Sequence, residues 1–337
     1  MSGVQLLQPA PRSAHFLRVP GRNVTIVAGR GVAIASGMSF KKLVCPIDFS
    51  PGSQQAMRVA VRLANERDAE LVLVHSWYLP PVAFPGEFMY PEDVVQQLSD
   101  QAQRGLEAAV AEAGKLGARH VTSRLLAGPP WQQIVDLAKH EPAFGLIVIG
   151  THGRTGLARV VLGSVTELVV RHAPCPVLTV RPETKPLPFS HVLCPVDLSK
   201  PARDAMGLAA DFVQPGSAGI TLLHVIERPV LFGDGLEPDS HRDLNARHAA
   251  LLDRWTAELK TKVAVPVTQL TRIGRPGAQV LALLDEDPTF DLVVMGSHGH
   301  TGASRLLLGS VAEKVVRHAR CPVVVAHSNH SALPAQR

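Results

Sequence analysis

The stretch GTHGRTGLARVVLGSV, from Gly150 to Val165, recurs almost unchanged as GSHGHTGASRLLLGSV, from Gly296 to Val311. The two copies continue without a gap for 31 positions, of which 19 are identical. A second pair of segments, beginning at Cys45 and Cys194, shares the pattern Cys-Pro-x-Asp-x-Ser. Because the offsets are 146 and 149 residues, the repeat indicates two homologous domains rather than a solenoid of short units.

Both copies lie in a chain that alternates apolar, β-branched runs with helix-like segments. In the first domain we expect strands at 42–47, 70–76, 121–127, 146–150 and 176–180, with helices at 51–67, 91–115, 131–139 and 164–172. In the second we expect strands at 191–196, 220–226, 266–271, 292–296 and 322–326, with helices at 200–213, 240–261, 277–285 and 310–318. This alternation predicts an α/β fold of two tandem, doubly wound, five-stranded parallel sheets.

The domain boundaries follow from this series of elements. We place the domains at 40–182 and 188–328, joined by a short proline-containing linker that we expect to be stiff. Residues 1–39 are expected to form a disordered extension, with Met38 as an alternative start, and 329–337 a C-terminal tail. His327 and His330 are interpreted as solvated tail residues rather than metal ligands.

Composition excludes several classes of function. The net charge is only +5 and aromatic residues make up 4% of the chain, without the dense basic patch of a nucleic-acid-binding protein. No apolar run approaches the roughly 18 residues of a membrane span. The four cysteines each precede proline, at paired positions without zinc-ligand spacing. They are expected to be small buried residues in a reducing compartment, and we predict a cytoplasmic protein.

The glycine-rich loop has the properties of a phosphate-binding segment. Its glycines permit close backbone approach, no carboxylate precedes Glu167, and Ser164 begins a helix whose dipole favours an anion. Arg154 in the first copy and His300 at the same position in the second can reach phosphate charge. An alternative explains the serine without any ligand, because Ser164-x-x-Glu167 and Ser310-x-x-Glu313 also fit a capping box.

The spacing of the loop does not match common phosphate motifs. Neither GxGxxG after the first strand nor GxxxxGK[ST] is present, which disfavours a dinucleotide-binding domain and a P-loop NTPase. Both copies instead satisfy G-x2-G-x9-G-[ST]. Together with CPIDFS, the strand-two histidine, GxHGxTG and the closing CPV, this resembles the ATP-binding type of the universal stress protein family, with tandem domains. The resemblance runs from about residue 40 to 328.

The resemblance implies a Rossmann-like fold of the adenine nucleotide alpha hydrolase-like type, and an ATP molecule, with Mg²⁺, across the carboxyl ends of strands one and four. The implied contacts in the first domain are Pro46, Ile47, Asp48, Ser76, Gly128, Gly150, Gly153, Arg154, Gly163, Ser164 and Val165. Those in the second are Pro195, Val196, Asp197, Val225, Gly274, Gly296, Gly299, His300, Gly309, Ser310 and Val311. Without the resemblance, Asp48 also fits a simple turn or helix-capping residue.

Chemistry beyond binding has little support in the sequence. Each predicted pocket offers one clear carboxylate and lacks the second acid and the lysine that phosphoryl transfer uses. His152 and His298 are candidate bases, or side chains that brace the loop. We expect a nucleotide-dependent regulator or sensor in stress response, with a slow ATPase, or an interaction protein with non-functional pockets, as alternatives. The last strand of each domain predicts an intrachain pseudo-dimer, with a homo-oligomer and a regulatory protein as further partners.

Overall fold

The computed structural model describes residues 40–79, 90–151, 162–184, 188–227, 239–299 and 308–327. Both halves fold as the alternation predicts, with five strands and four helices each in the described residues. The first half contains β1 (Lys42–Pro46), α1 (Pro51–Arg67), β2 (Glu70–Trp77), α2 (Glu92–Lys115), β3 (Val121–Ala127), α3 (Pro130–His140), β4 (Phe144–Gly150), α4 (Ser164–His172) and β5 (Val177–Val180). The second contains β6 (His191–Val196), α5 (Lys200–Ala210), β7 (Gly219–Ile226), α6 (Asp239–Lys262), β8 (Val267–Ile273), α7 (Pro276–Glu286), β9 (Leu292–Gly296), α8 (Ser310–His318) and β10 (Val323–Ala326).

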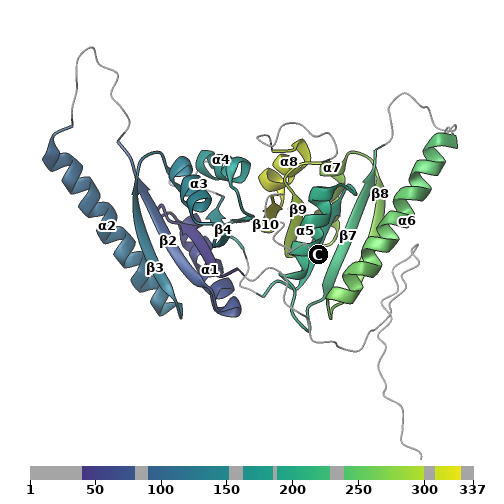
Figure 1. Ribbon diagram of the computed structural model, residues 1–337, viewed down its shortest axis with the longest axis horizontal. Coiled ribbons are helices and arrows are strands. Elements are labelled where there is room, and N and C mark those ends of the chain that lie inside the picture. Colours follow the sequence, from purple (N-terminus) through teal and green to yellow (C-terminus); the bar gives the residue numbers. More distant parts are fainter. Residues whose placement is uncertain are drawn as a thin grey trace, which may run out of the picture.

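The ten strands form one continuous sheet in the order β3-β2-β1-β4-β5-β10-β9-β6-β7-β8. Neighbouring strands within each half are parallel, as predicted. At the centre β5 and β10 pair antiparallel, with Leu178 opposite Val324, and the Thr179 hydroxyl donates to the carbonyl of Val323 at 3.1 Å. The two predicted sheets are therefore fused, and the predicted intrachain pseudo-dimer is confirmed by this central pair. Figure 1 shows the halves side by side, with α2 and α6 at the outer ends.

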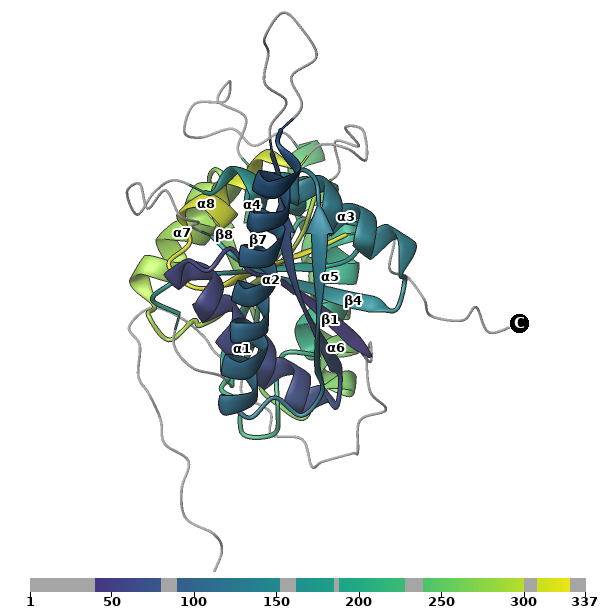
Figure 2. The same cartoon turned by 90° about the vertical axis from the view of Figure 1, so that its left-hand side faces the viewer.

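Two helical layers cover the sheet. A first cluster of buried residues packs α1, α2, α5 and α6 on one face, and a second packs α3, α4, α7 and α8 on the other. In the end view of Figure 2, the long α2 crosses in front of the sheet of the first half. Both clusters contain residues from both halves, so the chain has a shared core on each face. Among the helices of the described residues, none is long and apolar enough to cross a membrane.

The four cysteines are buried and unpaired by disulfides, as their positions predict. Burial raises the pKa of the Cys175 and Cys194 thiols to about 12. These side chains therefore act as small apolar core residues, not as nucleophiles.

Helix α5 is shorter than predicted. It ends at Ala210, because the N–H groups of Asp211 and Phe212 bond the carbonyls three residues before them and tighten the last turn. Pro215 and Gly216 follow soon after this turn. The apolar pattern alone extended the helix to 213, since Phe212 is buried although it lies beyond the helix.

The residues that follow β5 and β10 cross the junction between the halves. Arg181 donates to the carbonyl of Arg317 at 2.8 Å, at the carboxyl end of α8. His327, at the equivalent position, bonds the carbonyl of Val170 in α4 through Nε2 at 2.9 Å. The prediction of a solvated His327 is therefore wrong: its ring packs across the junction, and burial lowers its pKa to about 4. His330 lies outside the described residues.

An ion-pair cluster joins the same two helices. The Arg317 guanidinium lies 3.3 Å from a carboxylate oxygen of Glu167 in the other half, and 3.4 Å from Glu313 in its own helix. Arg171 also pairs with Glu167, at 3.1 Å. Helices α4 and α8, which begin at the two glycine loops, are thus linked directly by side chains.

Candidate functional site

The strand order places the ends of β1 and β4 next to each other in the first half, and those of β6 and β9 in the second. These are the points at which the winding of each half reverses, since β2 follows on one side of β1 and β5 on the far side of β4. Ligands of open α/β sheets bind beyond the carboxyl ends of the strands at such points. The predicted contacts can therefore be judged by their positions around these two strand ends.

Asp48 lies two residues beyond β1 and forms a tight turn into α1. Its Oδ1 accepts from the backbone N–H of Ser50 at 3.0 Å and from the Ser50 hydroxyl at 2.6 Å. Asp197 repeats this arrangement with Ser199, at 3.0 and 2.5 Å. Each carboxylate is thus fixed at the amino end of a helix, where the dipole stabilises negative charge. The serines also cap the helices: the Ser50 oxygen accepts from the N–H of Ser53, and the Ser199 oxygen accepts from that of Ala202.

The residue after each aspartate has a left-handed backbone. Phe49 has φ of 66° and Leu198 of 67°, a conformation that bulky side chains rarely adopt. The strain recurs at the same position in both halves, directly beside the predicted ligand carboxylate. Strained backbone of this kind concentrates at functional sites, where surrounding contacts hold it in place.

The histidine of each second strand braces the same turn. Nδ1 of His75 lies 2.6 Å from the carbonyl oxygen of Ile47, and Nδ1 of His224 lies 2.9 Å from that of Val196. In the first half the His75 ring also packs against that of Phe49, with centroids 4.5 Å apart and the ring planes tilted by 38°. These histidines contact the residue after β1 and the last residue of β6, so their role is to position the turn that carries each aspartate. The sequence marked them only as part of a motif.

The glycine loop approaches the backbone of the first helix closely. A Cβ on Gly150 would lie 2.7 Å from the carbonyl carbon of Gly52, and one on Gly296 would lie 3.1 Å from that of Pro201. In the second half, a Cβ on Gly299 would lie 2.3 Å from Oδ2 of Asp197. The loop after β9 therefore rests directly on the carboxylate that follows β6.

Helices α4 and α8 do not begin with the capping box that was the alternative explanation for Ser164 and Ser310, so that alternative is wrong. Gly163 and Gly309 occupy the N-cap positions without a side-chain cap, and Ser164 and Ser310 are the first helical residues. Glu167 pairs with arginines instead of returning to the serine. Because glycine has no side chain with which to cap, the first turn keeps exposed serines and N–H groups without intrahelical partners.

Each half has one further predicted glycine, which lies directly after β3 in the first half and directly after β8 in the second. Gly128 has φ of +131° and Gly274 of +139°, and their N–H groups donate to the ends of β2 and β7. The Ser76 hydroxyl donates to the carbonyl of Gly128 at 2.7 Å, whereas Val225, at the equivalent position, packs on the apolar cluster. Ser76 therefore uses its side chain within the protein and leaves its backbone for a ligand.

Sequence reasoning missed one repeated residue near these turns. The amide of Gln133 covers Gly128, and that of Gln279 covers Gly274, each 2.9 Å from where a Cβ would stand. Both glutamines lie five residues after the glycine, so the signal was present in the aligned repeats GPPWQQ and GRPGAQ. The apolar side chains of Val165 and Val311 pack against the core, which leaves only their backbone available to a ligand.

The structure gathers most of the predicted residues around the two strand ends. Pro46 ends β1 and Ile47 follows it, whereas Pro195 and Val196 are the last two residues of β6. Gly153, Arg154, His300 and the candidate base His152 lie outside the described residues. His298 is described, and its Nδ1 lies 2.8 Å from the hydroxyl of Ser297, which favours bracing of the loop over proton transfer.

Comparison with known proteins agrees with this architecture. The sequence matches the model of the "Universal stress protein family" over residues 39–181 and again over 188–327. It is 30% identical over 312 residues to the universal stress protein Rv2623 of Mycobacterium tuberculosis, covering 88% of this chain and 99% of that protein. It is 37% identical over 147 residues to the universal stress protein MJ0531 of Methanocaldococcus jannaschii, covering 43% of this chain and 85% of that one.

Solved structures show the same fold. A universal stress protein from Archaeoglobus fulgidus superposes with a TM-score of 0.63 at 21% identity, covering 86% of this chain and 99% of that chain. A putative universal stress protein from Pseudomonas aeruginosa gives 0.56 at 15% identity, covering 85% and 92%. At these identities the likeness concerns the fold alone.

Proposed function

Because this chain belongs to the universal stress protein family, we propose that each half binds one ATP molecule with Mg²⁺ and that the protein acts as a nucleotide-dependent regulator or sensor in stress response. The proposed sites lie at the β1/β4 and β6/β9 strand ends. Family membership supports the stress-response role, and the geometry of the strand ends supports the nucleotide.

The contact between Gly299 and Asp197 carries the proposal. An ATP molecule that spans the two strand ends needs its ribose near one and its phosphates near the other. The 2.3 Å separation between a Cβ on Gly299 and Oδ2 of Asp197 shows that the loop after β9 contacts the carboxylate after β6, which supports one continuous site for both proposed subsites. Any larger residue at position 299 would have to displace the Asp197 carboxylate, so glycine is what allows this close approach.

The amino end of α8 favours the phosphates in the same site. Gly309 leaves the helix uncapped, Ser310 presents an exposed hydroxyl at its first position, and the dipole concentrates positive potential there. The same arrangement of Gly163 and Ser164 begins α4. Since the capping box is absent from both helices, the serine hydroxyls are available to donate to phosphate oxygens.

Mg²⁺ would enter these sites with the nucleotide. Within the described residues there is no cluster of three histidine, cysteine or acidic side chains that could hold a metal ion. Phosphate oxygens would then supply much of the coordination, as is usual for this ion. Asp197 contacts the loop after β9, and Asp48 is its equivalent in the first half, so these carboxylates are the candidates to assist the ion.

Nucleotide content per chain tests the proposal. The purified full-length protein is denatured, and the released nucleotides are separated by anion-exchange chromatography and quantified. Up to two ATP molecules per chain are expected. Release of ADP, together with turnover of added ATP, would favour the slow ATPase. If neither nucleotide is released, and the protein does not bind added Mg²⁺–ATP in dialysis, the proposed sites are absent.

Single variants separate the two sites. Asp48→Asn and Asp197→Asn should each reduce ATP content by about half, because each changes one site while keeping a side-chain acceptor for the serine. Asp136→Asn, on the exposed face of α3, is the matched control and should retain full content. Equal content in all four proteins would contradict the assignment of the aspartates.

We also propose that the chain forms a homodimer on top of its intrachain pseudo-dimer, and that other proteins recognise the nucleotide-bound form. Homologous halves with a self-complementary surface favour such two-fold assembly. Analytical ultracentrifugation with and without Mg²⁺–ATP tests the assembly. A monomer under both conditions at about 50 μM would contradict it.

A further inference from the structure

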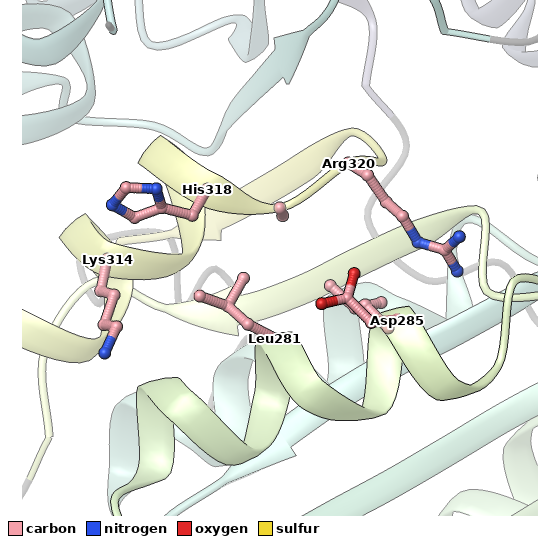
Figure 3. A pocket seen from close by; sticks show the side chains of 7 residues that line it. Leu281, Asp285, Lys314, His318 and Arg320 are labelled. Atoms are coloured by element: carbon pink, nitrogen blue, oxygen red, sulfur yellow. The ribbon is translucent and has the colours of Figure 1, made fainter. Parts of the chain in front are cut away.

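A cavity of about 310 Å³ lies between α7 and α8 on the outer face of the second half. Leu281 and Leu284 form its floor, and charged side chains surround it. Figure 3 shows Lys314 and His318 toward one end and Asp285 and Arg320 toward the other, with Leu281 between them. Its volume is at the lower end of the roughly 300–1,000 Å³ typical of small-molecule sites.

The first half shows what the corresponding place can hold. In α3, Trp131 packs against the apolar cluster, and its ring lies 5.2 Å from that of His172, tilted by 35°. The aligned segments GPPWQQ and GRPGAQ place Gly277 of α7 at the position of Trp131. The indole ring that covers α4 is therefore missing from α8, where only the aliphatic stem of Lys314 lies over Gly277.

The histidines at the ends of α4 and α8 also differ in how far they are covered. His172 is partly covered, and burial is the main cause that lowers its pKa. His318, at the equivalent position in α8, is exposed. Neither His318 nor Lys314 forms a hydrogen bond or ion pair with the residues that the structure describes. In the second half the imidazole ring of His318 and the ammonium group of Lys314 are thus exposed. In the first half the ring of His172 is covered by Trp131.

The charges around the cavity also distinguish the halves. Lys314 replaces Leu168 and Arg320 replaces Pro174, so two permanent cations stand where the first half has apolar residues. The reverse change, Asp285 for Lys139, adds one acid. Arg320 also donates to the carbonyl of Asp287 at 2.9 Å, but the residues that line the cavity still carry two permanent positive charges and one negative charge, which favours a ligand with negative charge.

The cavity is separate from the proposed nucleotide site. Helix α8 begins at Ser310, beside that site, whereas His318 is its last residue. A rise of 1.5 Å per residue places the two ends about 12 Å apart. A ligand between α7 and α8 would therefore not occupy the nucleotide site.

We propose that the α7–α8 cavity binds a small aromatic carboxylate. Its ring takes the place that Trp131 fills in the first half, on the face of His318 and against Leu281. Its carboxylate pairs with Lys314 or Arg320. The class of ligand follows from the internal repeat, because the aromatic ring is the group that the second half lacks and the cations are the groups that it gains.

Calorimetric titration of the full-length protein with indole-3-acetate tests the proposal. Saturable binding with a Kd below about 1 mM is expected for a ligand of this size. 3-Methylindole lacks the carboxylate, and acetate lacks the ring, so each should bind at least tenfold more weakly. Equal binding of 3-methylindole and indole-3-acetate would show nonspecific hydrophobic binding and would overturn the proposal. An absence of saturable binding of indole-3-acetate would also overturn it.

A double variant that copies the first half locates the site. Gly277→Trp with Lys314→Leu restores the Trp131 and Leu168 pair, and the flexible Lys314 stem that a Cβ on Gly277 would touch at 3.1 Å is removed. Binding should fall at least tenfold while ATP content and thermal unfolding stay unchanged. Lys314→Ala should weaken binding severalfold without filling the cavity, and Asp285→Asn should not weaken it. Undiminished binding to both Lys314 variants would contradict the assignment.

Discussion

The two halves of the molecule are most alike where backbone conformation shapes the proposed nucleotide site. They differ most where side chains lie on the outer face or pack across the junction between the halves. Asp48 and Asp197 make the same turn, with φ of 66° and 67° at the next residue. By contrast, Gly277 stands in the second half at the position of Trp131, and His327 stands at the position of Arg181. Sites built from main-chain geometry admit few alternative residues, whereas packing and pairing can be solved in several ways. The duplication therefore repeats the proposed nucleotide site and diversifies its surroundings.

The tightest backbone contact provides the largest expected difference between the halves. Gly150→Ala should lower the free energy of unfolding by about 3 kcal/mol, because a Cβ would lie 2.7 Å from the Gly52 backbone. Gly296→Ala should cost only about 1 kcal/mol, since its nearest atoms, in Pro201, are 3.1 Å away or more. Urea denaturation measures both. Equal losses would show that the first turn of α1 relaxes as readily as that of α5.

The junction should respond to pH through one half only. His327 has a pKa of about 4 in the folded protein, against an ordinary value of 6.5. Between these values the unfolded chain binds a proton that the folded chain excludes, so stability falls as the pH drops from about 6.5 to 4. The loss approaches about 3 kcal/mol. Urea midpoints measured between pH 7 and pH 4 report it.

His327→Arg is the control for that titration. It reproduces the contact of Arg181, whose guanidinium is partly buried at the equivalent position and donates to a helix carbonyl at 2.8 Å. The variant should lose that part of the pH dependence which is due to His327. The wild-type slope in the variant would assign the effect to other groups, among them His191, whose pKa is also lowered by burial.

The glycine turns beside β3 and β8 should behave alike. Gly128→Ala and Gly274→Ala should each cost about 1–2 kcal/mol, because φ is +131° and +139° and a glutamine amide lies 2.9 Å from the added Cβ. Thermal unfolding of the two variants should agree within error. A marked difference would show that Gln133 and Gln279 are held with unequal strength.

The smallest expected effect concerns the ion pair across the junction. Arg317→Gln removes a partner of Glu167 at 3.3 Å, and both side chains are partly exposed. A loss of about 0.5 kcal/mol is expected, and it should shrink in 1 M salt. Arg171→Gln removes the pair within α4 and is the matched control. If Arg171→Gln lowers the free energy of unfolding more than Arg317→Gln does, the pair within α4 contributes more to stability than the pair across the junction.

Prediction from the sequence succeeded where a local pattern has one physical solution. The apolar runs predicted each strand to within about two residues, and the helix predicted at 51–67 has the bounds of α1. It failed where the answer depends on tertiary contacts. The serine of the capping-box pattern lies one position too late to cap, and His327 is read as tail unless the other half is known to cover it. All the predicted ATP contacts remain predictions, and those at Gly153, Arg154 and His300 also lie outside the described residues.

The central antiparallel pair also has a consequence for synthesis. β5 ends at Val180, but its partner β10 ends only at Ala326, so the ribosome must add nearly 150 residues before the sheet can close. At 5–20 residues per second this interval is about 7–30 s. Throughout it, the first half carries an open strand edge, whose four residues are all buried in the finished protein and which could pair with β5 of a neighbouring nascent chain on the same messenger RNA. Slow translation of the second half should therefore increase misassembly between chains.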